Sequence, residues 1–195
     1  KSHDKSAHSL GEQAEELTSD LETLRHQRAA SGSRLHLLEE MQHAREGLTD
    51  AVKHVLDNPD QFPQVQGILG DAINTKHADA NIVEIALGQN VQLLLVDTSN
   101  SVKQVEQSLR EVQGRVGLLP TDLDVPTENV PNGITPLLSL IQVAEFAKNA
   151  AGIILAKTAV CSTLESAFEL QRLHPSWRFI TNDGNLIETD GRIFV

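Results

Sequence analysis

The polar stretch Asp97-Thr98-Ser99 follows a dense apolar run over residues 91–96. α/β proteins often place reacting groups at the ends of buried strands, so Asp97 is the first candidate for chemistry. A phosphoacceptor carboxylate would need a neighbouring acidic pair and a suitably placed lysine, and the sequence offers neither. The hydroxyl residues that follow favour the simpler role, in which Asp97 caps the next helix.

The other reactive side chains are scattered. Cys161, the single cysteine, lies in the apolar run TAVC without a nearby histidine or asparagine, so we expect a buried small hydrophobic residue. One cysteine excludes an internal disulfide and fits a reducing compartment. His26, His36, His43 and His54 lack the spacing of a metal-binding helix, and no phosphate-binding glycine loop is present. We therefore expect no catalytic residue, cofactor or metal, and no enzymatic activity, on this chain.

The formal net charge is −11, from 27 acidic and 16 basic residues. The acidic residues are spread along the chain, and such a surface repels phosphates on average, so contact with DNA would need a local basic patch. Lys103 and Arg110 lie on one predicted helix and, with Lys53, are the candidate DNA contacts, although ordinary surface solubility explains them equally well. We expect any DNA binding to be feeble and steeply dependent on salt.

The chain shows no sign of a membrane segment. No apolar run reaches spanning length, and the N-terminus lacks the apolar core of a signal peptide. We therefore expect a cytoplasmic protein without membrane contact.

Residues 82–120 predict one helix–strand–helix–strand unit. The first helix ends at Gly88, a strand covers 91–96, and a second helix ends at Gly114. A short strand over 115–119 then stops at Pro120. The second helix has one apolar face, made of Val102, Val105, Leu109 and Val112.

The later chain repeats this unit. PLLSLI at 136–141 parallels ILGDAI at 68–73, so that Ile141 corresponds to Ile73. Val160 then corresponds to Leu95 and Phe179 to Val116, and the offset between the copies shrinks along the chain. Ser162 and Glu165 predict a capping box, and Asp183-Gly184 predicts a tight hairpin between strands at 178–181 and 186–188.

The sequence thus predicts an α/β (mixed α+β) fold of two pseudo-repeated subdomains. They cover 64–122 and 134–195, the second cut short at its end, and an exposed linker over 123–133 joins them.

Residues 10–57 predict a helical arm. Residues 1–9 are polar, and we expect them to be disordered or a cloning remnant. Apolar residues at 10, 14, 17, 21 and 24 alternate spacings of four and three, as in a coiled coil. The seam falters at Arg28 and around Gly32, which predicts two helices, about 10–30 and 34–57. The alternative is a pair of amphipathic helices that pack on the globular part.

Together these segments resemble the hinge of bacterial SMC (structural maintenance of chromosomes) proteins and the coiled-coil arm beside it. SRLHLLEEMQ at 33–42 is similar to the end of the arm, and VKHVL at 52–56 to the short helix that leads into the hinge. IALG at 85–88, the strand to Val96 and GRVGLLP at 114–120 resemble the first hinge subdomain. PLL at 136–138, AV at 159–160, ESA at 165–167 and FITNDG at 179–184 resemble the second. The order and spacing of these segments carry the resemblance more than any single motif does.

The resemblance implies a pseudo-twofold domain that forms a ring-shaped homodimer with the hinge of a second SMC chain. It implies a nucleoid-associated function in chromosome condensation and segregation. ATP binding by the ATPase heads and contact with the kleisin subunit would take place elsewhere in the longer protein. The hinge would serve dimerisation and would be a place where DNA enters the ring.

The implied dimer would form by edge-to-edge sheet pairing, in which 186–195 of one chain meets the first subdomain of its partner. The candidate interface residues are Leu186, Ile187, Asp190, Gly191, Arg192, Ile193, Gly114 and Arg115. Asp190 departs from the family pattern, which has a Gly-Gly pair at this place. A second glycine pair and the returning arm helix are expected beyond Val195.

A second hypothesis is an α/β sensory or ligand-binding domain tethered to a coiled coil. It predicts a small-molecule pocket at the strand ends near Asp97 and Thr181. A zinc-hook coiled coil is excluded because the sequence has no C-x-x-C.

Overall fold

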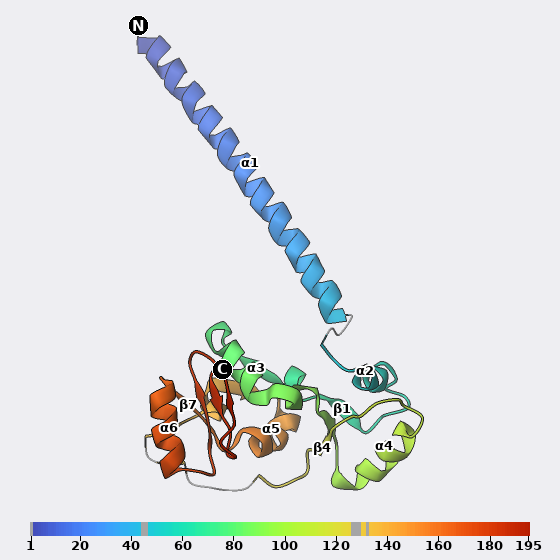
Figure 1. Cartoon of the computed structure of the whole chain (residues 1–195). Helices are drawn as coiled ribbons and strands as arrows, with labels where there is room; N and C mark the ends of the chain where they lie inside the picture. The colour runs from blue at the N-terminus through green and yellow to red at the C-terminus, as the bar shows by residue number, and fades with distance from the viewer. Residues whose placement is uncertain (1, 44–46, 126–129, 132) are drawn as a thin grey trace. The chain divides into compact units, whose positions relative to one another are not determined.

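The computed structural model of the chain describes residues 2–43, 47–125, 130–131 and 133–195. The chain divides into two units, 1–47 and 48–195. The first is a single helix and the second is a mixed α/β domain, labelled by element in Figure 1.

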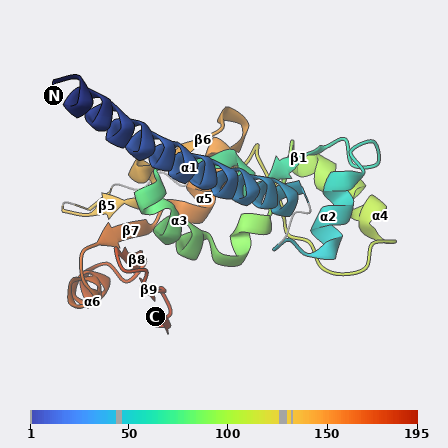
Figure 2. The ribbon, with the colours of Figure 1, turned by 90° about the horizontal axis from the view of Figure 1, so that it is seen from above.

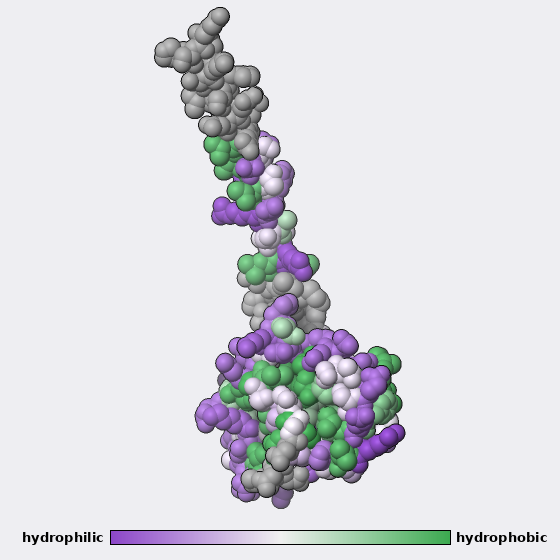
Figure 3. All heavy atoms as spheres, turned by 90° about the vertical axis from the view of Figure 1, so that its left-hand side faces the viewer, coloured by the Kyte–Doolittle hydropathy of each residue, from purple (hydrophilic) through white to green (hydrophobic). Residues whose placement is uncertain are grey.

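Helix α1 covers Ser2–His43 without a break. Residues 2–9 are helical, against the expectation of disorder there, and the helix continues through Gly32, where the sequence predicted a break. A glycine inside a helix costs only about 1 kcal/mol relative to alanine, which a long helix tolerates. The side chains described in α1 are those of residues 17–37, and among them Leu17, Leu21 and Leu24 are more than half exposed. Figure 3 shows hydrophobic side chains along this part of the helix.

Within one continuous helix the four–three spacing also continues. Positions 17, 21, 24, 28, 31 and 35 keep the same register. Arg28 and Ser31 therefore form a polar layer inside an otherwise leucine-rich seam, where the sequence had indicated a break.

Helix α2, Asp50–Asp57, belongs to the globular unit. Its Val52 and Val55 are buried and pack with Phe62 against the first sheet. The predicted arm helix over 34–57 is therefore wrong in its second half, and the domain begins at Leu48 instead of residue 64. The boundary differs from the prediction because the apolar face of α2 packs on the domain. This is the arrangement that the alternative of amphipathic helices packed on the globular part predicted for this segment.

The first subdomain contains a three-stranded sheet in the order β1-β3-β4. Strand β3 is antiparallel to β1 and parallel to β4. Helices α2 and α4 lie beside this sheet (Figures 1 and 2). The elements are β1 Val65–Ile68, β2 Ile73–Thr75, α3 Ala80–Leu87, β3 Leu94–Val96, α4 Val102–Leu109 and β4 Leu118–Pro120.

The second subdomain contains a five-stranded sheet in the order β10-β9-β8-β7-β5. Strand β7 is antiparallel to β5 and parallel to β8, as β3 is to β1 and β4. The elements are β5 Thr135–Pro136, β6 Ile141–Val143, α5 Lys148–Leu155, β7 Thr158–Cys161, α6 Leu164–Leu173, β8 Arg178–Thr181, β9 Leu186–Ile187 and β10 Ile193–Phe194.

The duplication predicted from the sequence is present in the structure. Helix α3 begins at Ala80 and α5 begins at Lys148. The distance along the chain between these two starts equals the offset predicted from the ILGDAI and PLLSLI segments. Thr121 N donates to Val96 O at 2.9 Å, and Asn182 N donates to Cys161 O at 3.2 Å. These matching bonds make Asn182 the counterpart of Thr121. The last strands of the two copies are therefore shifted by two positions from the alignment that the sequence predicted.

Both predicted caps are displaced by one residue. Thr98, not Asp97, accepts from the backbone N–H of Ser101. Thr163 and Ser166, not Ser162 and Glu165, form the capping box of α6. In each case two adjacent residues were able to cap, and the chosen one brings its oxygen to the N–H three residues later.

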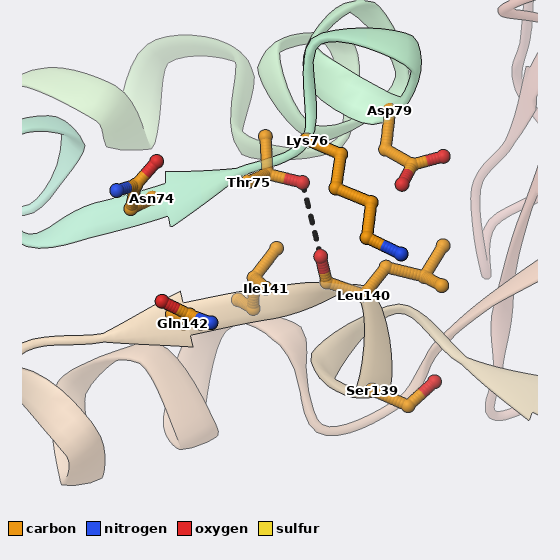
Figure 4. Close-up of a pocket in the computed structure, with 8 residues that line it drawn as sticks. All are labelled: Asn74, Thr75, Lys76, Asp79, Ser139, Leu140, Ile141 and Gln142. Carbon is orange, nitrogen blue, oxygen red and sulfur yellow. Dashed lines mark hydrogen bonds between the residues drawn. The ribbon is translucent and has the colours of Figure 1, made fainter.

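Strands β2 and β6 join the two subdomains. They form an antiparallel two-stranded ribbon in which Asn74 lies opposite Gln142. Thr75 Oγ1 donates to Leu140 O at 3.0 Å, as Figure 4 shows. A hollow of about 290 Å³ lies along this ribbon.

One core serves both subdomains. Buried Leu69, Ile82 and Leu95 of the first belong to the same cluster as Leu137 and Ile180 of the second. The linker prediction holds in part, because Leu123 is exposed but Val125 lies against Gly152 of α5. Residues 126–129 and 132 of that linker lie outside the described residues. The subdomains are thus two halves of one packed body.

Candidate dimer interface

The outer strands of the two sheets are the natural surfaces for sheet pairing. Strand β4 ends the first sheet, and β10 ends the second. Ile193 and Phe194 of β10 are 44% and 49% exposed. Apolar side chains on an outer strand favour association with another strand.

Two residues of the predicted interface are placed differently from expectation. Leu186 and Ile187 form β9, which lies between β8 and β10. Their side chains are buried within the domain, because the alternating faces of β9 meet two separate apolar clusters. These side chains are therefore not available to a partner. The candidate interface on this sheet is reduced to β10 and the turn that precedes it.

The turn between β9 and β10 brings Asp190, Gly191 and Arg192 together. Gly191 adopts φ +86°, a conformation that favours glycine. Asp190 accepts from Arg192 N at 3.1 Å and from Arg192 Nε at 2.8 Å. The backbone N–H and the guanidinium of Arg192 lower the pKa of the Asp190 carboxyl. The Arg192 guanidinium also lies 5.8 Å from the ring centre of Phe194, so the turn presents an ordered ion pair beside an exposed aromatic ring.

Gly114 and Arg115 lie in the segment that leads into β4. Gly114 adopts φ +112°, and a Cβ added there would lie 3.1 Å from the Ala51 side chain in α2. Arg115 is exposed and lines a hollow of about 450 Å³ between α2 and the first sheet. The predicted residues thus fall into two groups, one in the segment before β4 and one on β9, β10 and the turn between them. Pairing between two copies needs two such separate groups. The interface itself stays a prediction.

The candidate DNA contacts lie on α2 and near α4. Lys103 is exposed on α4, and Lys53 is half-buried on α2. Arg110 Nε lies 3.6 Å from Glu106 Oε1, so its charge is partly balanced. Both helices pack on the same apolar cluster. This region carries acids among its bases, and DNA contact stays a prediction.

The strand ends that could host chemistry are used by the fold itself. Asp97 Oδ1 accepts from Thr98 N at 2.7 Å. Asp122 accepts from Ser99 N at 2.8 Å and from Ser99 Oγ at 2.7 Å. These bonds lower the pKa of the Asp122 carboxyl. Thr181 Oγ1 likewise accepts from Asn185 N at 3.0 Å. The N–H and hydroxyl of Ser99, just after β3, are thus already bonded to a carboxylate of the chain, which disfavours the sensory hypothesis.

The remaining reactive groups are structural. Cys161 is half-buried, less than predicted, because it ends β7; its Sγ lies 3.5 Å from Ile180 O. Burial raises the pKa of the Cys161 thiol. Among the described residues, no three His, Cys, Asp or Glu side chains are grouped to hold a metal ion. No described helix has the length and apolar character to cross a membrane.

Sequence reasoning missed Arg178. Its Nη2 donates to Ala86 O at the end of α3 at 2.8 Å, which joins the two subdomains. Its Nε lies 3.0 Å from Glu188 Oε2, out of line for a hydrogen bond. The available signal was its place between Trp177 and Phe179, both buried, because a charge flanked by large core residues needs partners.

A duplicated α/β body with β4 and β10 as outer strands of its sheets, exposed apolar side chains on β10, and strand-end polar groups bonded within the chain is typical of a protein-interaction module. Residues 62–171 match the family model described as "SMC proteins Flexible Hinge Domain". The match covers more than half of the chain, which therefore belongs to the SMC hinge family.

The relatives agree with this assignment. The chromosome partition protein Smc of Halothermothrix orenii is 24% identical over 172 residues, 83% of this chain and 14% of that protein. That of Lactiplantibacillus plantarum is 28% identical over 176 residues, 83% of this chain and 15% of that protein. The chain thus spans about a seventh of the length of these relatives.

Solved structures show the same fold. The asymmetric dimer of the Geobacillus stearothermophilus SMC hinge domain has a TM-score of 0.75 and 26% identity, covering 88% of this chain and 75% of that one. The Pyrococcus furiosus Smc hinge domain with an extended coiled coil has a TM-score of 0.64 and 22% identity, covering 91% and 65%.

Proposed function

We propose that this chain is the homodimerising hinge of an SMC chromosome condensation and segregation ATPase. The observation that carries the proposal is that β4 and β10 are outer strands of their sheets, with half-exposed Ile193 and Phe194 on the latter. The similar Geobacillus stearothermophilus hinge crystallised as an asymmetric dimer, which supports a dimer here.

The mechanism is strand addition. Strand β10 of one copy lies along β4 of the other, and the twofold relation repeats this contact at the opposite end, which closes a ring. Backbone hydrogen bonds supply affinity, and the side chains on either face supply specificity. Pro120 in β4 has no N–H and cannot donate a hydrogen bond to a partner strand. The hydrogen bonds between the two copies therefore centre on Leu118.

The role of the chain is mechanical and non-catalytic, and it needs no cofactor. The leucine seam of α1 belongs to a coiled-coil arm, and the dimer joins two such arms. ATP hydrolysis and kleisin contact belong to other parts of the longer protein. The site of action is the cytoplasm, at the nucleoid, and any DNA contact through Lys53, Lys103 and Arg110 is weak.

Solution mass tests the dimer directly. Light scattering at micromolar concentration gives twice the 21.3 kDa of one chain if the proposal holds. A strict monomer at high concentration contradicts it.

Gly191→Glu tests the placement of the interface. An added side chain at Gly191 meets no atom of its own subunit within 4 Å, although the positive φ adds about 1–2 kcal/mol of local strain. We expect weaker dimerisation of a folded subunit. Gly133→Glu is the matched control, since Gly133 also has positive φ and open surroundings but precedes β5. An unchanged association constant in Gly191→Glu would count against the placement.

A further inference from the structure

Strand β10 is weakly anchored to the domain by its side chains. It is two residues long and lies at the outer edge of its sheet, beside β9. Ile193 and Phe194 stand opposite Ile187 and Leu186. The two β9 residues are buried in apolar clusters, whereas Ile193 and Phe194 are half-exposed. A short segment with few buried contacts opens easily, so the order of β10 depends on its backbone pairing and on the turn before it.

The turn before β10 supplies a series of contacts that runs through Arg192. Glu188 N donates to Arg192 O at 2.9 Å, and Gly191 N donates to Glu188 O at 3.0 Å, which closes the turn. The Asp190 carboxylate accepts from Arg192 N at 3.1 Å and from Arg192 Nε at 2.8 Å. The Arg192 guanidinium lies 5.8 Å from the ring centre of Phe194, within reach of cation–π attraction. Asp190 thus acts on the backbone that enters β10 and, through Arg192, on one of the two β10 side chains.

These contacts hold β10 in the conformation that strand addition needs. Arg192 and Phe194 are two positions apart in an extended segment, so their side chains share one face of the sheet. Holding both on that face keeps the backbone of β10 in the plane of the sheet, where an outer strand offers its N–H and C=O groups to another strand. An edge that is already ordered loses less conformational entropy when it pairs.

We infer that Asp190 is a positioning residue for dimerisation, which holds Arg192 and, through it, the Phe194 ring, so that β10 is ordered before a second copy binds. The inference rests on the proposed function, in which β10 pairs with β4 of a second copy. The role lies within one subunit, so Asp190 needs no contact with the partner. A glycine, the residue that the family pattern has at this place, could accept neither of the two bonds from Arg192.

The first test is the dimer dissociation constant, measured by sedimentation equilibrium. Both copies must present an ordered β10 for the ring to close, so a loss of order in each copy acts twice. Exposed ion pairs are weak singly, and with this doubling we expect Asp190→Ala to raise the dissociation constant about fivefold. Asp190→Asn keeps an oxygen that can accept from Arg192 N, so it should raise the constant only about twofold.

Asp183→Ala is the matched control for the first test. Asp183 is also an exposed aspartate followed by a glycine of positive φ, in the turn at the other end of β9. That turn joins β9 to β8 and does not lead into the outer strand. The Asp183→Ala variant should therefore have the dissociation constant of the wild type.

The second test asks whether Asp190 acts within its own subunit. Hydrogen–deuterium exchange, measured on protein diluted below the wild-type dissociation constant, reports the order of residues 188–195 without a partner. Exchange in this segment should be faster in Asp190→Ala and in Arg192→Ala than in the wild type. The double variant should weaken the dimer by less than the product of the two single effects, because the two residues act through one another.

The outcomes are separable. An unchanged dissociation constant in Asp190→Ala overturns the inference and leaves the dimer standing. A weaker dimer with unchanged exchange in the free subunit also overturns it, because Asp190 would then act by contact with the partner. A lower melting temperature of the diluted Asp190→Ala subunit would assign the effect to the whole fold, with the same consequence. A wild-type chain that stays monomeric overturns the proposed function and this inference together.

Discussion

Arg178→Leu should destabilise the globular unit strongly, although Arg178 lies in no proposed interface. The side chain is four-fifths buried, at 18% exposure, and Glu188 is 22% exposed. A hydrogen bond from a charged donor contributes about 1.5–3 kcal/mol, and the bond to Ala86 O is lost. Glu188 then loses its partner in a partly buried site, which adds about 1 kcal/mol after allowance for solvent screening. We expect a fall of about 3 kcal/mol in the free energy of unfolding.

Urea denaturation followed by circular dichroism measures this change. The midpoint should fall while the slope stays constant, because the surface exposed on unfolding is the same. Arg172→Leu is the matched control: Arg172 is an exposed cation on α6, and its loss should change stability by less than about 0.5 kcal/mol.

The double variant Arg178→Leu/Glu188→Leu separates the two contributions. If the unpaired carboxylate matters, the double variant is more stable than Arg178→Leu alone. A loss below about 1 kcal/mol for Arg178→Leu would refute the reasoning that this residue holds the subdomains together.

Four further outcomes are expected. Residues 48–195 should fold without α1, which a cooperative thermal melt would show. Val55→Ala should lower the free energy of unfolding of this unit by about 2 kcal/mol, because it leaves a cavity under α2. An unfolded fragment, or a substitution without effect on stability, would contradict a domain boundary at residue 48. The pKa of Asp122 is lowered in the folded chain, so this group stabilises the fold at pH values above its ordinary pKa, and the stabilisation is lost as the pH falls through its folded-state pKa. Ser99→Ala should therefore raise the Asp122 pKa in an NMR titration. An unchanged pKa would contradict the role given to the Ser99 bonds. Cys161 should react with iodoacetamide more slowly than free cysteine at pH 8, because burial raises its pKa; a faster rate would mean the thiol is activated.

Sequence reasoning identified the duplication because hydrophobic spacing survives in both halves. The predicted offset between the copies is reproduced by the starts of α3 and α5, and the β8 bounds are as predicted. The caps were each misplaced by one residue, since Asp97-Thr98 and Ser162-Thr163 are pairs of competent caps. Which one caps depends on where the preceding strand ends, and that is set by pairing with distant strands.

Other errors came from tertiary contacts that leave no local mark. Hydrophobic spacing alone does not distinguish an arm helix from α2, because Val52 and Val55 would suit a coiled-coil seam as well as a domain core. Gly32 lowers helix propensity, but α1 continues through it. The interface prediction included β9 because it took the whole end of the second subdomain, residues 186–195, as the contact, whereas the sheet order makes β10 the outer strand.

The β2–β6 ribbon has a consequence for how the domain folds. Its register joins Ile73 to Val143 and Thr75 to Ile141, residues that are far apart along the chain. Closing so long a loop costs entropy before any contact is gained, so such pairings form late. The sheets of each half, by contrast, close over shorter distances. Because Leu69 and Leu137 share one core, neither half completes its packing until the ribbon closes. The ribbon thus makes folding of the two halves a single cooperative event. During synthesis, the first half of the chain cannot complete its folding until the second half has been synthesised.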